Sequence, residues 1–282
     1  MTATHMSSTA ATWTYKYLPD AKLAGNDLRG SLVEHTVLDG ADLSEADLRP
    51  TGRRRTSWRA VRLARAILRN VNANDSIWIF CDLQRASAQG ARLENAVFRG
   101  VNLAWIDMRG ARLSLTRFVG CAGIHGDFSR ADLIGADLSG ALVFGGVLMD
   151  RTHSHLPVSV FDEARFIGAN LKRACFRDAQ LSGTNFDDAE MSGIELNGAN
   201  LSGATLRRAS LRGARLNRID PPAEFANAYG APGALFLNAD LREADFSGAD
   251  LRGVRFWNCD LRGARLDGGA LSSADVRAPI LL

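Results

Sequence analysis

Two histidines separated by one residue are the first candidates for chemistry in this chain. His153 and His155 would share one face of an extended segment, so both imidazoles could approach the same metal ion. Asp150 or Asp162 could add a carboxylate, but no further cysteine or histidine lies nearby in sequence, and structural zinc normally takes four ligands. A solvent-exposed loop is therefore the preferred interpretation, and a metal site is the alternative.

The rest of the sequence contains no recognisable catalytic motif. It has no glycine-rich phosphate-binding loop, no His-Glu-x-x-His pair and no serine in a nucleophile elbow. We therefore expect no catalytic residue, no cofactor site and no metal site, in a protein that is not an enzyme. A biosynthetic enzyme that uses residues 149–163 in a pocket is an outlying hypothesis, which replacement of His153 and His155 by alanine would test.

Arginine is the residue type whose distribution indicates binding. The 282 residues carry a net charge of only +3, yet residues 51–130 hold 14 Arg against 5 Asp and Glu. Cationic side chains beside an exposed tryptophan suit phosphates, nucleic acid or an acidic protein surface. The alternative is that arginine stems cover the surface and pair with neighbouring carboxylates. The candidate partner-binding residues are Arg54, Arg55, Arg69, Arg85, Trp105, Arg109, His153 and His155.

The elements that must position these residues follow a period of five. An apolar residue returns at every fifth position from Leu23, and this register continues to Leu148. A second register runs from Phe166 to Val276. Neither the helical period of 3.6 nor the strand period of 2 fits this spacing. The backbone must therefore turn by a fixed amount in each pentad.

The pentads share a consensus of a small residue, Asp or Asn, Leu or Phe, a polar residue and Gly. Residues 131–135, 199–203 and 249–253 show it best. With this consensus the chain resembles the pentapeptide-repeat family over residues 21–276. The resemblance implies an all-β fold, namely a right-handed quadrilateral parallel β-helix with loop insertions. Each coil of that fold has four pentads and hence twenty residues.

Residues twenty apart should therefore stack, and the interior of such a narrow shaft must be close-packed from coil to coil. One predicted interior column contains Leu38, Trp58, Trp78, Phe98, Phe118 and Leu138. A second contains Leu23, Leu43, Leu63, Leu83 and Leu103. The predicted exterior columns are Arg29, Arg49, Arg69 and Arg109, and beside them Arg65, Arg85 and Trp105.

Three segments break the register, namely residues 49–55, 149–163 and 217–234. Arg53 would occupy an interior position, where an unpaired guanidinium is prohibitively costly, so residues 49–55 should form a basic loop outside the coil.

The aromatic side chains of residues 13–17 could cover the open end of the first coil. We expect an N-terminal tail and cap over residues 1–20, a first run over 21–148, an insertion loop over 149–163, a second run over 164–276 with a loop near 217–234, and a C-terminal cap or dimer contact over 277–282.

Composition narrows the cellular setting. No apolar run approaches the roughly 20 residues that a membrane-spanning helix needs, and residues 1–11 lack the hydrophobic stretch of a secretory signal. Cys81, Cys121 and Cys259 fall at small interior positions, where cysteine acts as a small apolar residue, whereas Cys175 should face outward. We therefore expect a cytoplasmic protein that does not associate with membranes.

Two functions remain open at this stage. The resemblance implies a non-enzymatic protein that binds DNA gyrase or topoisomerase IV and protects it from an antibiotic, with the rod imitating DNA and the insertion loops contacting the enzyme. It also implies a homodimer formed through the C-terminal end. Because imitation of DNA requires an acidic surface and residues 51–130 are basic, the alternative is an Arg-rich scaffold for nucleic acid or an acidic protein partner.

Overall fold

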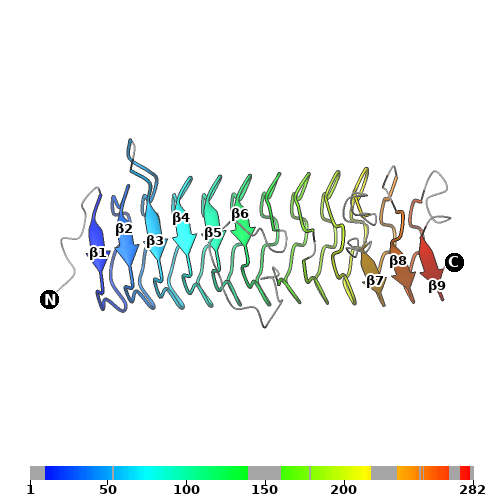
Figure 1. Ribbon diagram of the computed structural model, residues 1–282, viewed down its shortest axis with the longest axis horizontal. Coiled ribbons are helices and arrows are strands. Elements are labelled where there is room, and N and C mark those ends of the chain that lie inside the picture. Colours follow the sequence, from blue (N-terminus) through cyan, green and yellow to red (C-terminus); the bar gives the residue numbers. More distant parts are fainter. Residues whose placement is uncertain are drawn as a thin grey trace, which may run out of the picture.

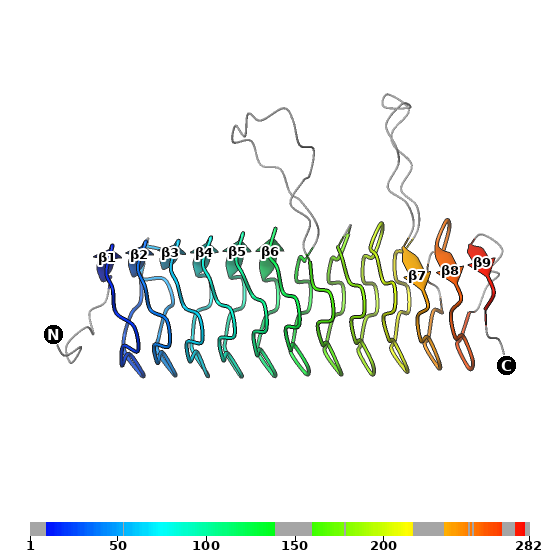
Figure 2. The ribbon, with the colours of Figure 1, turned by 90° about the horizontal axis from the view of Figure 1, so that it is seen from below.

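The computed structural model describes residues 10–52, 54–138, 160–177, 179–216, 234–247, 249, 251–266 and 274–279. These residues form an elongated solenoid of about 11 turns, with the coils stacked along one axis (Figure 1, Figure 2). No helix in this part of the chain is long and apolar enough to cross a membrane. The fold is the right-handed quadrilateral parallel β-helix that the repeat predicted.

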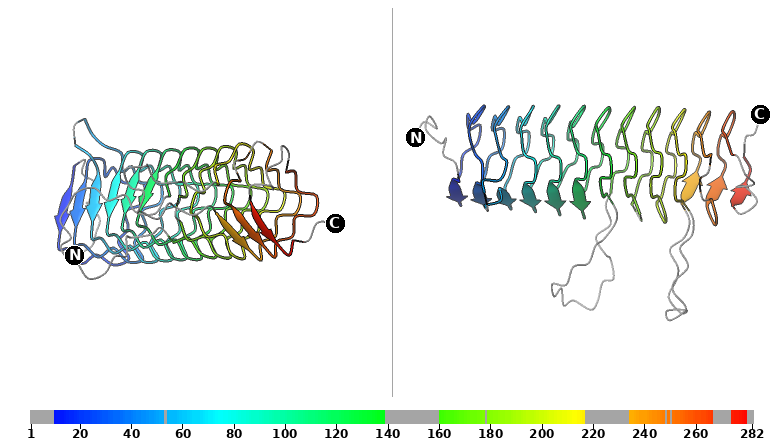
Figure 3. Two further views of the ribbon diagram at one scale, coloured as in Figure 1. Left: turned by 45° about the vertical axis from the view of Figure 1, so that its right-hand side comes forward. Right: turned by 90° about the horizontal axis from the view of Figure 1, so that it is seen from above.

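Short strands from successive coils pair side by side and form two parallel sheets that extend along the rod. The first sheet has the order β1 to β6 and the second has the order β7 to β9, and every pair is parallel. Figure 3 shows them as two separate rows along the rod. The strands are β1 (Thr12–Thr14), β2 (Leu32–Glu34), β3 (Ser57–Arg59), β4 (Ile77–Ile79), β5 (Val97–Arg99), β6 (Arg117–Val119), β7 (Leu235–Leu237), β8 (Arg255–Trp257) and β9 (Asp275–Arg277).

Each pentad makes one side of a square coil. Around Leu133, both this residue and Ala131 are buried, and the next two residues form a turn that is closed by a 2.9 Å hydrogen bond from the Ala136 N–H to the Leu133 carbonyl. Gly135, the second turn residue, has a φ of 63°, which lies in the left-handed region. Glycine takes this conformation without steric cost, which explains its place in the consensus.

Backbone bridges between successive coils define four walls. Wall 1 carries β1–β6, and wall 2, which follows it along the chain, carries β7–β9 because Leu235 pairs with Asn200 of that wall. Wall 3 includes the interior residues Met108 and Phe128, and wall 4 includes Leu113 and Leu133. A side chain that points outward from one wall can therefore reach its counterparts in the coils above and below.

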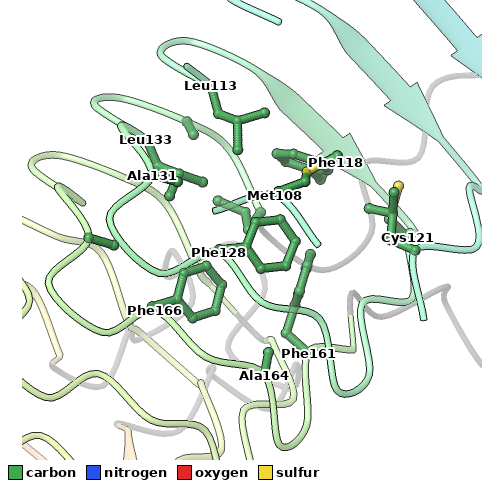
Figure 4. Packing of buried hydrophobic residues seen from close by; sticks show 14 of the residues in the cluster. Met108, Leu113, Phe118, Cys121, Phe128, Ala131, Leu133, Phe161, Ala164 and Phe166 are labelled. Carbon is green, nitrogen blue, oxygen red and sulfur yellow. The ribbon is translucent and has the colours of Figure 1, made fainter. Parts of the chain in front are cut away.

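Aromatic side chains fill the shaft in columns. On wall 1, Trp58, Trp78, Phe98 and Phe118 stack in that order, with ring centroids 5.0, 5.9 and 5.1 Å apart. On wall 3, Phe128 and Phe166 stack at 5.0 Å beside Phe161 (Figure 4). The predicted aromatic column from Trp58 to Phe118 is thus confirmed.

The buried tryptophans need hydrogen-bond partners, because an unpaired indole N–H in a dry core is costly. Trp58 donates to the Ser31 hydroxyl at 3.0 Å, and Trp78 donates to the Ser76 hydroxyl at 2.8 Å. Both serines occupy the small interior position of their pentad and are buried. The repeat therefore supplies an acceptor beside both of these indoles.

The coil from Val33 to Trp58 has five residues more than the regular twenty, which corrects the predicted columns. Val33 pairs with Trp58, so Leu38 lies below Leu63 and not below Trp58. Likewise Leu43 lies below Leu68, so the column through Leu23, Leu43, Leu63, Leu83 and Leu103 is also wrong. The extra residues leave the coil at Thr51 and Arg54, whose backbones exchange hydrogen bonds of 2.9 and 2.8 Å. The expected excursion of residues 49–55 from the coil exists, but Arg53 lies outside the described residues.

From Thr12 onward the chain forms the first described coil of the solenoid. Trp13 in β1 is buried and pairs with Val33, whereas the side chains of Tyr15 and Tyr17 are 77% and 75% exposed. The three rings of this segment therefore do not cover the solenoid end together. Because parallel pairing begins at Thr12, the coils start inside the range 1–20 that we expected to be a tail and cap.

The solenoid resumes after the first insertion at Val160, inside the range 149–163 expected for the loop. Val160 pairs with Ala122 and Phe161 is fully buried, while residues 139–159 lie outside the described part of the chain. Leu138 and Leu216, the last described residues before 139–159 and 217–233, both belong to wall 1, and the chain resumes on wall 2 each time. The described residues that flank these two ranges therefore lie at the same edge of the solenoid, between walls 1 and 2.

A candidate binding surface at one corner of the solenoid

The corner between walls 2 and 3 carries a column of large polar and aromatic side chains. Arg62, Asp82, Asn102, Ala122 and Val160 pair in succession on wall 2, and the residue three positions after each one lies at the turn. We call these turn residues the Arg–Trp corner. They are Arg65, Arg85, Trp105, His125 and Glu163, in the order of the coils. All five have a positive φ between 56° and 61°.

The side chains of this column contact one another from coil to coil. The Arg85 guanidinium lies 5.9 Å from the Trp105 ring centroid, and the His125 ring lies 4.0 Å from it on the side of the following coil. Nδ1 of His125 is 3.0 Å from Oε2 of Glu163. Trp105 is 51% exposed. Because neighbours cover both faces of its ring, the exposed part of Trp105 is mainly the ring edge.

Arg65 and Arg85 have no carboxylate partner among the described residues, unlike outward arginines such as Arg62 and Arg109. Elsewhere an Asp before the interior residue pairs with an Arg after it. Four such ladder pairs are Asp47–Arg49, Asp107–Arg109, Asp240–Arg242 and Asp260–Arg262, with Oδ2–Nη2 distances of 2.8, 2.7, 2.8 and 2.5 Å. The corner therefore retains positive charge that the ladders neutralise elsewhere.

A shallow hollow of about 370 Å³ lies beside the two unpaired arginines. Arg62 on its wall is held by Asp39 at 2.5 Å. Its lining residues are Pro19, Asp20, Asp39, Gly40, Arg62, Ala64, Arg65, Gln84 and Arg85. The hollow is open to solvent, so a projecting side chain of a partner could enter it.

Two further predicted contact residues lie at the other end of wall 3, at the turn into wall 4. Nε of Arg69 donates to the Ser87 hydroxyl and to Oε1 of Gln89, both at 3.2 Å. Arg109 makes a two-pronged contact with Asp107, with Nε–Oδ1 2.9 Å and Nη2–Oδ2 2.7 Å. The charge of Arg109 is therefore neutralised, and its value for an anionic partner is reduced.

The remaining predicted residues do not join this surface. Arg54 and Arg55 lie at the corner between walls 4 and 1, diagonally opposite, where Nη2 of Arg54 donates to the Thr12 hydroxyl at 2.8 Å. His153 and His155 lie outside the described residues. The expected column of Arg29, Arg49, Arg69 and Arg109 is also wrong, because the longer coil moves Arg69 onto wall 3 while Arg29 and Arg49 stay on wall 4.

His125 was not among the residues that the sequence indicated as candidates for binding. The signal was present, because His125 follows Trp105 by twenty residues and therefore stacks on it. The expected column of Arg65, Arg85 and Trp105 is confirmed. Among the residues that the structure describes, no three His, Cys, Asp or Glu side chains gather closely enough to hold a metal ion.

The four cysteines are free thiols, and three of them are part of the core. Burial raises the pKa of the Cys81 thiol to about 11 and that of Cys121 to about 12. Because the thiolate is the reactive form, both are inert at neutral pH. Cys175 is half-buried, and burial raises its pKa as well, although Arg177 opposes the shift.

A sequence model of pentapeptide repeats matches residues 18–49, 79–114, 152–183, 179–218, 232–258 and 239–277, as eight copies. These segments cover more than half of the chain. The chain belongs to the pentapeptide-repeat family. No match to it was found among curated proteins.

Solved structures of this family show similar coils. HetL, a pentapeptide-repeat protein involved in heterocyst differentiation regulation from the cyanobacterium Nostoc sp. strain PCC 7120, is 26% identical, with a TM-score of 0.58 over 92% of this chain and 93% of HetL. QnrB1, a plasmid-mediated fluoroquinolone resistance protein, is 18% identical, with a TM-score of 0.42 over 85% of this chain and 90% of QnrB1. At this identity the likeness to QnrB1 concerns the fold alone.

Proposed function

We propose that this pentapeptide-repeat protein is a non-enzymatic scaffold that binds an acidic surface of a protein partner through the Arg–Trp corner. The observation that supports it best is the pair Arg65 and Arg85, which have no carboxylate partner in the described coils and lie beside a half-exposed tryptophan. Two like charges one coil apart, at the strand spacing of about 4.8 Å, repel each other. An anionic side chain of a partner would relieve that repulsion.

The geometry of Trp105 favours a protein over nucleic acid. Proteins that bind single strands stack the bases on open aromatic faces. Arg85 and His125 cover the two faces of Trp105, so a base would have to displace one of them. An exposed ring edge flanked by arginines resembles the Trp- and Arg-rich centres of protein interfaces.

A scaffold of this kind needs no catalytic site. HetL is described by its part in regulating differentiation, and this chain shares its fold over most of its length. A rigid rod that offers a fixed array of side chains suits a regulatory contact with another macromolecule.

To test this proposal, fluorescent poly-glutamate and a fluorescent oligo(dT) strand would be titrated with the full chain. The variant is Arg65→Gln/Arg85→Gln. The matched control is Arg92→Gln/Arg130→Gln, which removes the same charge from wall 4 and its corner with wall 3, where neither arginine has an ion pair among the described residues. We expect poly-glutamate to bind at low salt and to weaken as salt rises, with a loss of about tenfold in the corner variant only.

Three outcomes would contradict the proposal. Tighter binding of oligo(dT) than of poly-glutamate, lost in the corner variant, would assign the corner to nucleic acid. Equal losses of poly-glutamate affinity in the two variants would show that net charge, and not the corner, accounts for the binding. If neither probe bound, the corner would not be a binding site for anionic groups.

Action on DNA gyrase or topoisomerase IV stays a more specific prediction. Imitation of DNA requires a continuous acidic wall, whereas the outward carboxylates of wall 3 alternate with arginines, as in Asp107–Arg109 and Asp260–Arg262. This arrangement lends the DNA-like surface no support. The direct measurement is gyrase supercoiling with the protein at micromolar concentration, with and without a quinolone. If the protein neither inhibits supercoiling nor rescues gyrase from the quinolone, the prediction is wrong.

Two other expectations also stay predictions. The homodimer through the C-terminal end involves residues 277–282, of which 280–282 lie outside the described part of the chain. Analytical ultracentrifugation of the full chain would determine its oligomeric state. The expected cytoplasmic location would be checked by fractionation of cells that express the protein.

A further inference from the structure

The outward side of the first sheet has a composition unlike that of the other walls. We define the outer sheet face as the outward side chains of β1–β6 together with Phe80 and Leu115, which lie at the two corners beside it. The six strands present three arginines, Arg59, Arg99 and Arg117, and a single carboxylate, Glu34. None of the three arginines has an ion pair among the described residues. This face is therefore cationic.

The centre of the outer sheet face is apolar. Ile77 and Ile79 point outward on β4, Val97 on β5 and Val119 on β6, and all four are partly exposed. Parallel pairing sets Ile77 beside Val97 and Ile79 beside Arg99. Aliphatic and guanidinium groups thus alternate over a rigid surface. β-Branched residues favour strands in any setting, so these four residues alone would not indicate a binding site.

Phe80 and Leu115 supply the second, independent observation. Their side chains are 65% and 59% exposed, and their φ angles are 52° and 59°. A left-handed backbone costs a residue with a side chain about 1–2 kcal/mol, and the next coils place Gly100 and Gly135 at these turns. A large apolar side chain at such a turn adds strain while it recovers little burial. Backbone strain that is not offset by packing is characteristic of binding sites.

The coils hold these two side chains in place. A Cβ atom at Gly100 would come within 2.6 Å of the Phe80 ring, so the ring lies directly over that glycine. A Cβ at Gly135 would lie 3.0 Å from Cδ2 of Leu115. The glycines allow the apolar side chains to rest against the following coil. Phe80 and Leu115 therefore flank the sheet from opposite corners as ordered groups.

We propose that the outer sheet face docks a segment of another protein that carries both apolar side chains and carboxylates. The carboxylates would pair with Arg59, Arg99 and Arg117, and the apolar side chains would cover Ile77, Ile79 and Val97 between Phe80 and Leu115. An excess of three arginines over one carboxylate makes an acidic segment the complementary occupant. Aliphatic side chains offer nucleic-acid bases no stacking platform, so a protein fits better than a nucleic acid.

The docking must use side chains, since the interior strands of the sheet already pair on both edges. The outer sheet face belongs to wall 1, and wall 2 separates it from the Arg–Trp corner. The proposal is therefore independent of the function proposed for that corner. A partner could occupy either surface alone.

The test is a selection of random dodecapeptides displayed on phage against the full-length protein. Excess soluble Phe80→Asn/Leu115→Asn variant competes during the selection, because asparagine accepts a left-handed backbone and this variant should fold. We expect enriched peptides that combine Leu, Ile, Phe or Trp with Asp or Glu. A synthetic peptide of the consensus should bind the wild type at least about tenfold more tightly than it binds either Phe80→Asn/Leu115→Asn or Arg99→Glu/Arg117→Glu.

The Arg65→Gln/Arg85→Gln corner variant is the control and should bind the peptide as the wild type does. Circular dichroism and the melting temperature verify that each variant is folded. A basic consensus, a failure to enrich any sequence over the competitor, or equal binding to the Asn variant would overturn the proposal. Loss of binding in the corner variant alone would assign the peptide to the corner, and would leave the outer sheet face without a ligand.

Discussion

At the scale of single residues, the left-handed turn position separates structural from functional side chains. Each pentad ends in such a turn, and glycine or a small polar residue occupies many of them. Phe80, Trp105, Leu115 and His125 are larger than the turn requires, and all four belong to the two proposed surfaces. The energetic preference of this position makes bulky residues there informative, whereas the same residues inside the shaft report only on packing.

Leu115→Gly tests this distinction directly. Removal of an exposed side chain from a left-handed turn should leave stability unchanged or raise the free energy of unfolding by up to about 1 kcal/mol, because relief of strain offsets the extra freedom of the unfolded chain. Leu113→Gly, two residues earlier in the core, should cost at least about 3 kcal/mol. Urea unfolding of both variants measures the contrast, and a large loss for Leu115→Gly would show that its packing matters to the fold.

The ladder pairs predict how stability depends on pH. Hydrogen bonds from Arg242 and Arg262 lower the pKa of Asp240 and Asp260 below the ordinary aspartate range. A lowered pKa adds stability above the ordinary value of about 4, and that stability is lost as pH falls through the lowered pKa. The melting temperature should therefore drop in acid. Asp240→Asn/Asp260→Asn should drop less over the same interval, and an equal drop would mean that other carboxylates account for the effect.

At the scale of the element, a coil keeps its register only when extra residues leave the solenoid and the chain returns to the same corner. The coil from Val33 to Trp58 has five extra residues, and it returns to register because Thr51 and Arg54 close the excursion. The buried Thr56 side chain seals the junction, since it accepts from the Gly30 N–H at 2.8 Å and donates to the Arg49 carbonyl at 3.0 Å. An excursion outside the coil leaves all four interior columns intact.

Deletion of residues 50–54 should consequently be tolerated. It restores a twenty-residue coil and leaves Arg55 at the turn, where arginine already occurs in the left-handed conformation at Arg65 and Arg85. Deletion of residues 86–90, also five in number, should unfold the neighbouring coils, because it moves each later side chain onto the preceding wall. Far-ultraviolet circular dichroism and thermal melting distinguish the two deletions, and equal tolerance of both would contradict a strict column requirement.

At the scale of the whole molecule, the protein is a rod in which each coil contacts only its neighbours. Its positive charge gathers in the first run, where residues 51–130 hold 14 Arg against 5 Asp and Glu. The Arg–Trp corner and most of the outer sheet face lie in that half. The second half, in contrast, also has ion pairs between adjacent coils, such as Asp187–Arg207 and Asp188–Arg208. The first half of the rod is thus suited to binding, whereas outward charges in the second half neutralise one another.

A rod of this kind should unfold locally. Phe186 is fully buried and stacks on Phe166 at 5.1 Å, so Phe186→Ala should cost about 3–5 kcal/mol in its own coils. Because stability in a solenoid is passed on through neighbouring coils, amide hydrogen exchange should speed up around residues 166–206 and change little in β1–β3. Uniform loss of protection along the rod would instead indicate one cooperative unit.

The repeat of five determined by itself the solenoid, its four-sided coil and the residues that face inward, because each pentad sets its own turn and burial pattern locally. Trp58 to Phe118 and the buried cysteines follow from that pattern alone. Only the tertiary structure decided which side chains share a wall. Stacking depends on the summed length of all the residues between two coils, so five extra residues before Trp58 moved Leu38 and Arg69 to other columns. The contact between Trp105 and His125, and the exposure of Phe80 and Leu115, likewise arise where one coil meets the next.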